Sequence, residues 1–295
     1  MALLCVGCTS ISTLPDTDIY LADLDRTSMT VSHVRNVTQR TGYDNQPAFT
    51  ADGNALLFVS DRSGSTDVYR YDILTSLTTQ ITDTRESEFS PTPMTDGKSF
   101  SAIRVGLPDD TTEAYTESQQ LWRYDLTGKP IAPILGTRRV GYHCWLDDGL
   151  VALFIVGDDK KGLPHRLVAT DLASRQTVDL ASNIGRTIKR MPDGRLSFVD
   201  KSDSTKWMFS TIAQGDAKPT PLIAAPLGSE DFCWLQDGTM ICVRGNTLVQ
   251  WKTGTTTFTP FATLADLVGT IVRITVNDDD TRIAFVLVKP PMPSK

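Results

Sequence analysis

The sequence is poor in the residues from which most catalytic and metal centres are built. It contains three histidines, His33, His143 and His165, and five cysteines among 295 residues. Histidines this scattered do not form the closely spaced His/Cys sets of zinc sites. The chain also has no Gly-x-Ser-x-Gly nucleophile elbow and no glycine-rich phosphate loop. We therefore expect no metal and no cofactor, and assign no catalytic residue.

Basic residues and long apolar runs are also scarce. Lysine and arginine number 29 against 35 acidic residues, a formal net charge of -6. Nucleic acid and anionic membranes repel such a protein unless a local basic patch intervenes, so we expect no nucleic-acid partner. No segment approaches the roughly 20 apolar residues that span a bilayer. Membrane contact would then require a lipid anchor.

Asp-Gly dipeptides recur at nearly even spacing. The intervals between the five copies are 44, 52, 45 and 44 residues, and an Asp-Asp pair follows 42 residues later. The six pairs begin at Asp52, Asp96, Asp148, Asp193, Asp237 and Asp279. Asp-Gly supplies the left-handed backbone that a tight hairpin needs, and an apolar run follows each pair. We therefore predict that every repeat begins with a β-hairpin.

Each repeat has room for four strands. The apolar runs lie at 55–60, 99–105, 150–156, 195–199, 239–244 and 282–288. A second alternating hairpin follows in the first three repeats, at 67–83, 120–135 and 165–181. Four strands per repeat, about six repeats and no helical periodicity are typical of a β-propeller. The predicted fold class is all-β: a six-bladed β-propeller with four-stranded antiparallel blades.

The two ends of the chain complete one blade. The last repeat has only two strands before Pro290, whereas DIYLADL (18–24) and TVSHVRNVT (30–38) supply two more at the start. We predict that this blade is closed by two N-terminal and two C-terminal strands, which removes open sheet edges. The expected organisation is a flexible N-terminus at 1–15, a propeller at 16–289 and a C-terminal tail at 290–295.

The first repeat, QPAFTADGNALLFVSDRSGSTDVYRYDI (46–73), resembles the bacterial Pro-Asp-Gly propeller repeat, a WD40-like repeat best known from the C-terminal domain of TolB. Weaker traces extend the resemblance over 18–288. It implies a TolB-like six-bladed propeller, without the N-terminal α/β domain of TolB. Because this family is largely bacterial and exported, it also implies a place in the cell envelope.

The first ten residues, MALLCVGCTS, resemble the end of a bacterial lipoprotein signal. In such signals small residues precede the cysteine that becomes the lipidated N-terminus, here Cys8. The basic start and the long apolar segment of a complete signal are missing. We interpret residues 1–15 as a truncated signal or an unstructured start. The expected localisation is export, as a periplasmic or outer-membrane lipoprotein of a bacterium.

One face of the predicted propeller carries charged loops. The loops that enter the innermost strands lie at 40–46, 84–90, 137–143, 183–189, 226–231 and 266–271, opposite the Asp-Gly turns. We call this the loop face. Its arginines recur from blade to blade with acidic neighbours, and guanidinium groups bind carboxylates in a bidentate way. The candidate binding residues here and at the channel mouth are Asp44, Arg85, Glu88, Arg138, Arg139, Tyr142, His143, Arg186 and Glu230.

These loops favour a non-catalytic, monomeric protein that binds a protein or peptide partner. An alternative is an enzyme or binding protein that acts on an anionic polysaccharide or a small ligand at the channel mouth. A third is a structural module whose loop charges are simply solvated. His143 is the one histidine near the predicted mouth, and a single general base without a nucleophile is weak support for catalysis.

Overall fold

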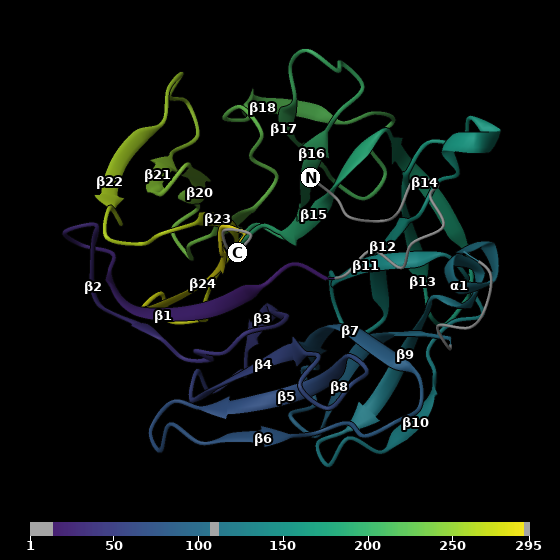
Figure 1. The fold of residues 1–295 in the computed structure, drawn as a ribbon. Helices are drawn as coiled ribbons and strands as arrows, with labels where there is room; N and C mark the ends of the chain where they lie inside the picture. Colours follow the sequence, from purple (N-terminus) through teal and green to yellow (C-terminus); the bar gives the residue numbers. More distant parts are fainter. Residues whose placement is uncertain (1–13, 107–111, 292–295) are drawn as a thin grey trace.

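The computed structural model describes residues 14–106 and 112–291. Six four-stranded antiparallel sheets are arranged around a central axis (Figure 1), which confirms the predicted fold. Cys8 and the predicted lipoprotein signal lie outside the described residues. No helix in the described ranges is long and apolar enough to cross a membrane.

The blades follow one another along the chain, innermost strand first. Blade 1 contains β3 (Asp44–Phe49), β4 (Ala55–Ser60), β5 (Asp67–Asp72) and β6 (Thr78–Gln80). Blade 2 contains β7 (Ser87–Pro93), β8 (Ser99–Val105), β9 (Gln120–Asp125) and β10 (Pro130–Pro133), with helix α1 (Thr112–Ser118) between β8 and β9. Blade 3 contains β11 (Val140–Trp145), β12 (Leu150–Ile155), β13 (Arg166–Asp171) and β14 (Thr177–Ser182), with the 3₁₀ helix η1 (Asp159–Lys161) between β12 and β13.

The second half of the ring repeats this plan. Blade 4 contains β15 (Ile184–Arg190), β16 (Leu196–Asp200), β17 (Met208–Ile212) and β18 (Thr220–Ala224). Blade 5 contains β19 (Phe232–Trp234), β20 (Met240–Arg244), β21 (Thr247–Trp251) and β22 (Thr259–Thr263). Blade 6 contains β23 (Thr270–Val276), β24 (Arg282–Val288), β1 (Thr17–Asp25) and β2 (Thr30–Asn36).

The turn aspartates close the first hairpin of each blade by accepting backbone hydrogen bonds. Asp52 Oδ1 accepts from the amide of Asn54 at 3.1 Å, and Gly53 between them has φ +66°. In blade 6 Asp280 adopts φ +57° at the glycine position, as the repeat predicts. Blade 3 differs from the prediction. There Asp147, not Asp148, accepts from the following amides, so this turn is shifted by one residue.

Blade 6 is built from both ends of the chain, as predicted. β1 pairs with β24 antiparallel, and β2 forms the outer edge of the sheet. The ammonium of Lys289, just after β24, lies 2.9 Å from both Asp16 Oδ1 and Asp18 Oδ2. This ion-paired closure fixes the start of β1 beside the linker that leads into blade 1.

Tryptophans join neighbouring blades by the same hydrogen bond at two places. Trp145 Nε1 on β11 donates to Ser101 Oγ on β8 at 2.9 Å, and Trp234 Nε1 on β19 donates to Ser197 Oγ on β16 at 2.8 Å. Each bond satisfies an indole N–H that burial would otherwise leave unpaired. The innermost strands are thereby held against the previous blade, and their first residues reach the loop face at fixed positions.

Candidate binding face

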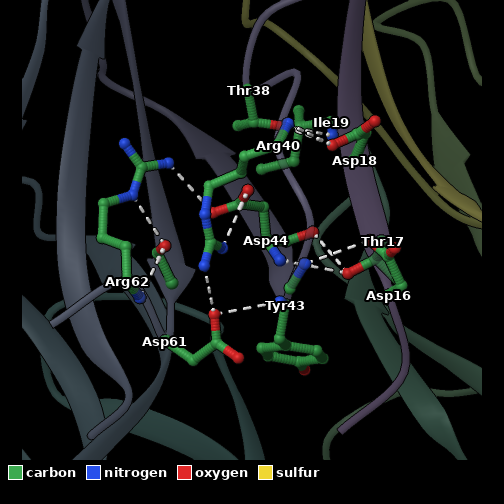
Figure 2. Close-up of polar contacts among 12 residues, drawn as sticks. Asp16, Thr17, Asp18, Ile19, Thr38, Arg40, Tyr43, Asp44, Asp61 and Arg62 are labelled. Carbon is green, nitrogen blue, oxygen red and sulfur yellow. Dashed lines mark hydrogen bonds and ion pairs between the residues drawn. The ribbon is translucent and has the colours of Figure 1, made fainter. Parts of the chain in front are cut away.

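Asp44 lies at the centre of a paired cluster where the chain enters blade 1 (Figure 2). Its carboxylate is fully buried and lies 3.3 Å from Arg40 Nη1 and 3.0 Å from Arg62 Nη2. Arg40 also contacts Asp61 at 2.8 Å. Two guanidinium groups thus compensate the buried charge. Asp44 therefore holds together the loop that carries Arg40 and the loop that carries Arg62. Because its carboxylate is buried, only the two arginines are placed to contact a partner.

Glu88 occupies the same place in blade 2. Each residue lies eight positions before its turn aspartate and opposite the equivalent residue of the second strand, Ser60 for Asp44 and Arg104 for Glu88. Glu88 is also fully buried, but it has no ion pair in the described part of the chain. Its surroundings are therefore different in kind from those of Asp44.

The hydrogen-bond donors to the Glu88 carboxylate are neutral hydroxyls. Oε1 accepts from Thr84 Oγ1 at 2.6 Å and from the Tyr124 hydroxyl at 3.1 Å, whereas Oε2 is buried without a partner among the described residues. Burial, with a smaller contribution from the nearby Asp67 charge, raises the pKa of Glu88 to about 7. This carboxyl therefore titrates near neutral pH.

Arg273 and Tyr142 meet across the channel. Tyr142 follows the buried Val140 by two residues on β11, and Arg273 follows Ile271 in the same way on β23. Arg273 Nη2 donates to the Tyr142 hydroxyl at 3.2 Å, and its guanidinium lies 5.4 Å from the ring centroid. The contact joins blade 6 to blade 3, which is opposite in the ring.

Arg186, at the equivalent position of β15, is held by blades 5 and 6. Its Nη2 donates to Asp231 Oδ2 and, at 2.9 Å, to the carbonyl of Val272. Burial opposes the charged form, but the Asp231 carboxylate outweighs it, and the pKa of Arg186 is raised. Its Nε is buried and has no partner in the described residues.

Glu230 supports Arg186 from the neighbouring blade. Its Oε2 accepts from the backbone amide of Arg186 at 3.0 Å, and its Oε1 lies 2.5 Å from Lys201 Nζ. Burial would raise the pKa of Glu230, but the bond from Lys201 and the charge of Arg186 outweigh it, so the pKa is lowered. Glu230 is therefore an ionised, internally paired group that orients the Arg186 backbone.

His143 is placed inside the molecule. It is 8% exposed, and its Nε2 lies 2.8 Å from Ser101 Oγ, the same hydroxyl that receives the Trp145 N–H. Burial lowers the pKa of His143 to about 3, so the ring is neutral at physiological pH. The histidine nearest the channel thus belongs to the contact between blades 2 and 3.

The three remaining candidates differ in accessibility. Arg139 is used internally: it donates to the carbonyls of Val156 at 2.9 Å and Gly157 at 2.6 Å, and pairs with Glu117 at 2.6 Å. Arg85 and Arg138 are exposed, and neither has an ion pair in the part of the chain that the structure describes.

The structure brings Arg186 and Glu230 together and places Tyr142 close to Arg186. Among the described residues no hydrogen bond or ion pair joins them to Asp44. Sequence reasoning missed Arg273 as a site residue, because it lies inside an apolar strand rather than in a loop. A usable signal existed: TIVRITV (270–276) carries a single charge at the strand position that Arg186 occupies in blade 4. No group of three or more His, Cys, Asp or Glu side chains in the described ranges could hold a metal ion.

No family model matches this chain. A segment of 39 residues is 44% identical to the Tol-Pal system protein TolB of Bordetella pertussis. That segment is 13% of this chain and 9% of the length of that protein, about one propeller repeat.

Solved structures match over nearly the whole propeller. A structure provisionally assigned as TolB from Agrobacterium tumefaciens superposes with a TM-score of 0.69 at 13% identity, covering 94% of this chain and 99% of its own. An oligogalacturonate lyase in complex with manganese gives a TM-score of 0.61 at 18% identity, covering 92% of this chain and 82% of its own. Identities this low show the fold alone: the chain is a TolB-like six-bladed propeller, a scaffold shared with an enzyme.

Proposed function

We propose that this chain is a non-catalytic protein of the bacterial cell envelope that binds a protein or peptide partner across its loop face. The observation that carries the proposal is the set of arginines there without an internal carboxylate. Arg85 and Arg138 are exposed on blades 2 and 3, and Arg273 at the channel is half-buried, all without an ion pair in the described ranges. Unpaired guanidinium groups around one opening attract acidic groups of a partner.

The opposite face of blade 4 is charged in a different way. There the Asp193 carboxylate is paired with Arg195 and accepts the backbone amide of that residue. Acidic turn groups of this kind are satisfied by their own hairpin. On the loop face, by contrast, Arg85 and Arg138 have no such pairing within their own loops among the described residues.

The envelope location is proposed from the likeness of one segment to a Tol-Pal system protein. Lipidation of Cys8 belongs to the same proposal. It would anchor an exported, monomeric protein at a membrane, and the mass of the mature N-terminal peptide from the native host tests it. An intact, unmodified Met1 would exclude the anchor.

A second candidate function is binding or cleavage of an anionic polysaccharide. The observation that favours it is the similarity of the fold to an oligogalacturonate lyase. The arginines named above would suit uronate carboxylates as well as acidic peptides.

The proposal is tested by affinity purification from envelope extracts with the wild type and an Arg85→Glu/Arg138→Glu variant. We expect a partner that the wild type recovers and the variant loses. The matched control is Lys98→Glu/Lys129→Glu, which makes the same charge change at exposed residues of the Asp-Gly face of blade 2. Equal loss in both variants, or recovery by all three proteins, would contradict a binding role for the loop face. A polysaccharide array then tests the second function.

A further inference from the structure

The channel mouth contains more positive than negative charge. Lys201 is paired with Glu230, and Arg186 with Asp231. Arg273 has a hydroxyl and an aromatic ring as its contacts, and no carboxylate among the described residues. A half-buried guanidinium without an anion is costly, because its surroundings replace water without replacing the counter-charge. The cluster therefore lacks one negative group.

The two arginines lie close together. Arg186 Nη2 donates to the carbonyl of Val272, the residue that precedes Arg273. Both guanidinium charges also act on the Tyr43 hydroxyl, where they partly offset the rise in pKa that burial causes. An anion between Arg186 and Arg273 would relieve their repulsion and reach the Arg273 donors that Tyr142 leaves free.

We infer that the channel mouth binds a carboxylate of an acidic peptide, with Arg273 as its principal ligand and Arg186 and Tyr142 beside it. This inference rests on the proposed function and specifies the chemistry of the partner. Arg85 and Arg138, on the loops entering blades 2 and 3, would contact further acidic residues of the same peptide.

The aromatic groups at the mouth favour a peptide over a sugar. One face of the Tyr142 ring is covered by the Arg273 guanidinium, and Phe154 packs against the ring at a centroid distance of 5.6 Å and an angle of 81°. Tyr43 is 6% exposed. These contacts leave little aromatic surface on which a pyranose could stack, whereas the Arg273 donors that Tyr142 leaves free can reach a carboxylate.

The test measures binding of a fluorescein-labelled peptide of four Asp-Glu repeats by fluorescence anisotropy. An Asn-Gln peptide of the same length is the uncharged probe, and binding of trigalacturonate is measured directly by isothermal titration calorimetry. We expect saturable binding of the acidic peptide, at least tenfold weaker binding by Arg273→Gln, and a smaller loss in Arg273→Lys, which keeps the charge but not the bidentate donors. Arg195→Gln on the opposite face is the matched control and should bind as the wild type.

Thermal unfolding by circular dichroism checks that each variant is folded. If Arg273→Gln is unfolded, the affinity of Arg273→Lys for the acidic peptide tests the inference instead. Absence of saturable binding, or equal affinity in all variants, would overturn the inference. So would Arg273-dependent binding of trigalacturonate without binding of the peptide. If the envelope partner is lost with Arg85→Glu/Arg138→Glu but kept with Arg273→Gln, the proposed function stands and the carboxylate site fails.

Discussion

Blades 1 and 2 each bury an acidic side chain, but they surround it with different partners. Each places a fully buried carboxylate at the start of its innermost strand, Asp44 in blade 1 and Glu88 in blade 2. Arg40 and Arg62 pair with Asp44, whereas the residues at the same distances from the next turn aspartate are Thr84 and Gly106. The repeat thus conserves the position of the acid in the fold but not its counter-charge.

This difference separates two energetic roles. A buried carboxylate with two guanidinium partners is a fixed charge whose removal leaves the partners uncompensated. A buried carboxylate with neutral donors is stable chiefly in its protonated form, because desolvation disfavours the charge. Blade 1 therefore depends on an ionised acid, and the start of the innermost strand of blade 2 depends on a neutral one.

The largest expected effect comes from removing the ionised carboxylate of blade 1. Asp44→Ala leaves Arg40 and Arg62 without their shared carboxylate, and we expect it to lower the free energy of unfolding by about 3 to 5 kcal/mol. Urea unfolding at pH 7 measures it. Asp61→Ala is the matched control: its carboxylate contacts only Arg40 of the two arginines and is 29% exposed, so we expect a loss of about 1 kcal/mol. Equal losses would show that burial of Asp44 does not matter.

The next largest effect concerns the neutral carboxyl of blade 2, Glu88. The pKa of Glu88 is raised to about 7 in the folded protein, from an ordinary value of 4.5. Between these two pH values the unfolded chain releases the proton while the folded protein keeps it, so stability falls as pH rises, and it stays low above pH 7. Below pH 4.5 both states are protonated, and the group contributes no pH dependence.

Glu88→Gln should remove this dependence. We expect the variant to match the wild type near pH 4.5 and to exceed its free energy of unfolding at pH 8 by on the order of 2 to 3 kcal/mol. Urea unfolding from pH 4.5 to 8 is the measurement. If the two pH profiles run parallel, Glu88 ionises normally in the folded protein and the contrast with Asp44 disappears.

The strands were predictable because their signals are local and repeated. β4, β8 and β24 have the bounds of the predicted runs 55–60, 99–105 and 282–288. Turn register was less secure: two adjacent aspartates in blade 3 offered alternative caps, and the protein uses Asp147.

Accessibility of the charged residues was not predictable. Asp44 and Glu88 look alike in the sequence, and what distinguishes them is the set of donors that the fold brings to each. Arg139 and Arg138 are neighbours in the chain, yet one is bound to backbone carbonyls and the other is exposed. The difference is that the fold places the carbonyls of Val156 and Gly157 beside Arg139. Arg273 was missed because it lies inside an apolar strand, and because its partner Tyr142 is 131 residues away in the sequence.

The smallest expected effect makes blade 2 resemble blade 1. Thr84 precedes Glu88 by four residues, as Arg40 precedes Asp44. Thr84→Arg should place a guanidinium beside the Glu88 carboxylate and lower its pKa, since a charge-assisted hydrogen bond replaces a neutral one. The fall in stability between pH 4.5 and 7 should then shrink, with a gain of about 1 kcal/mol over the wild type at pH 8. Thr84→Val loses the same hydroxyl without adding charge and should deepen the fall. If both variants behave alike, the missing guanidinium is not what separates the two blades, and the cause must be sought in the nearby Asp67 charge that also raises the pKa of Glu88.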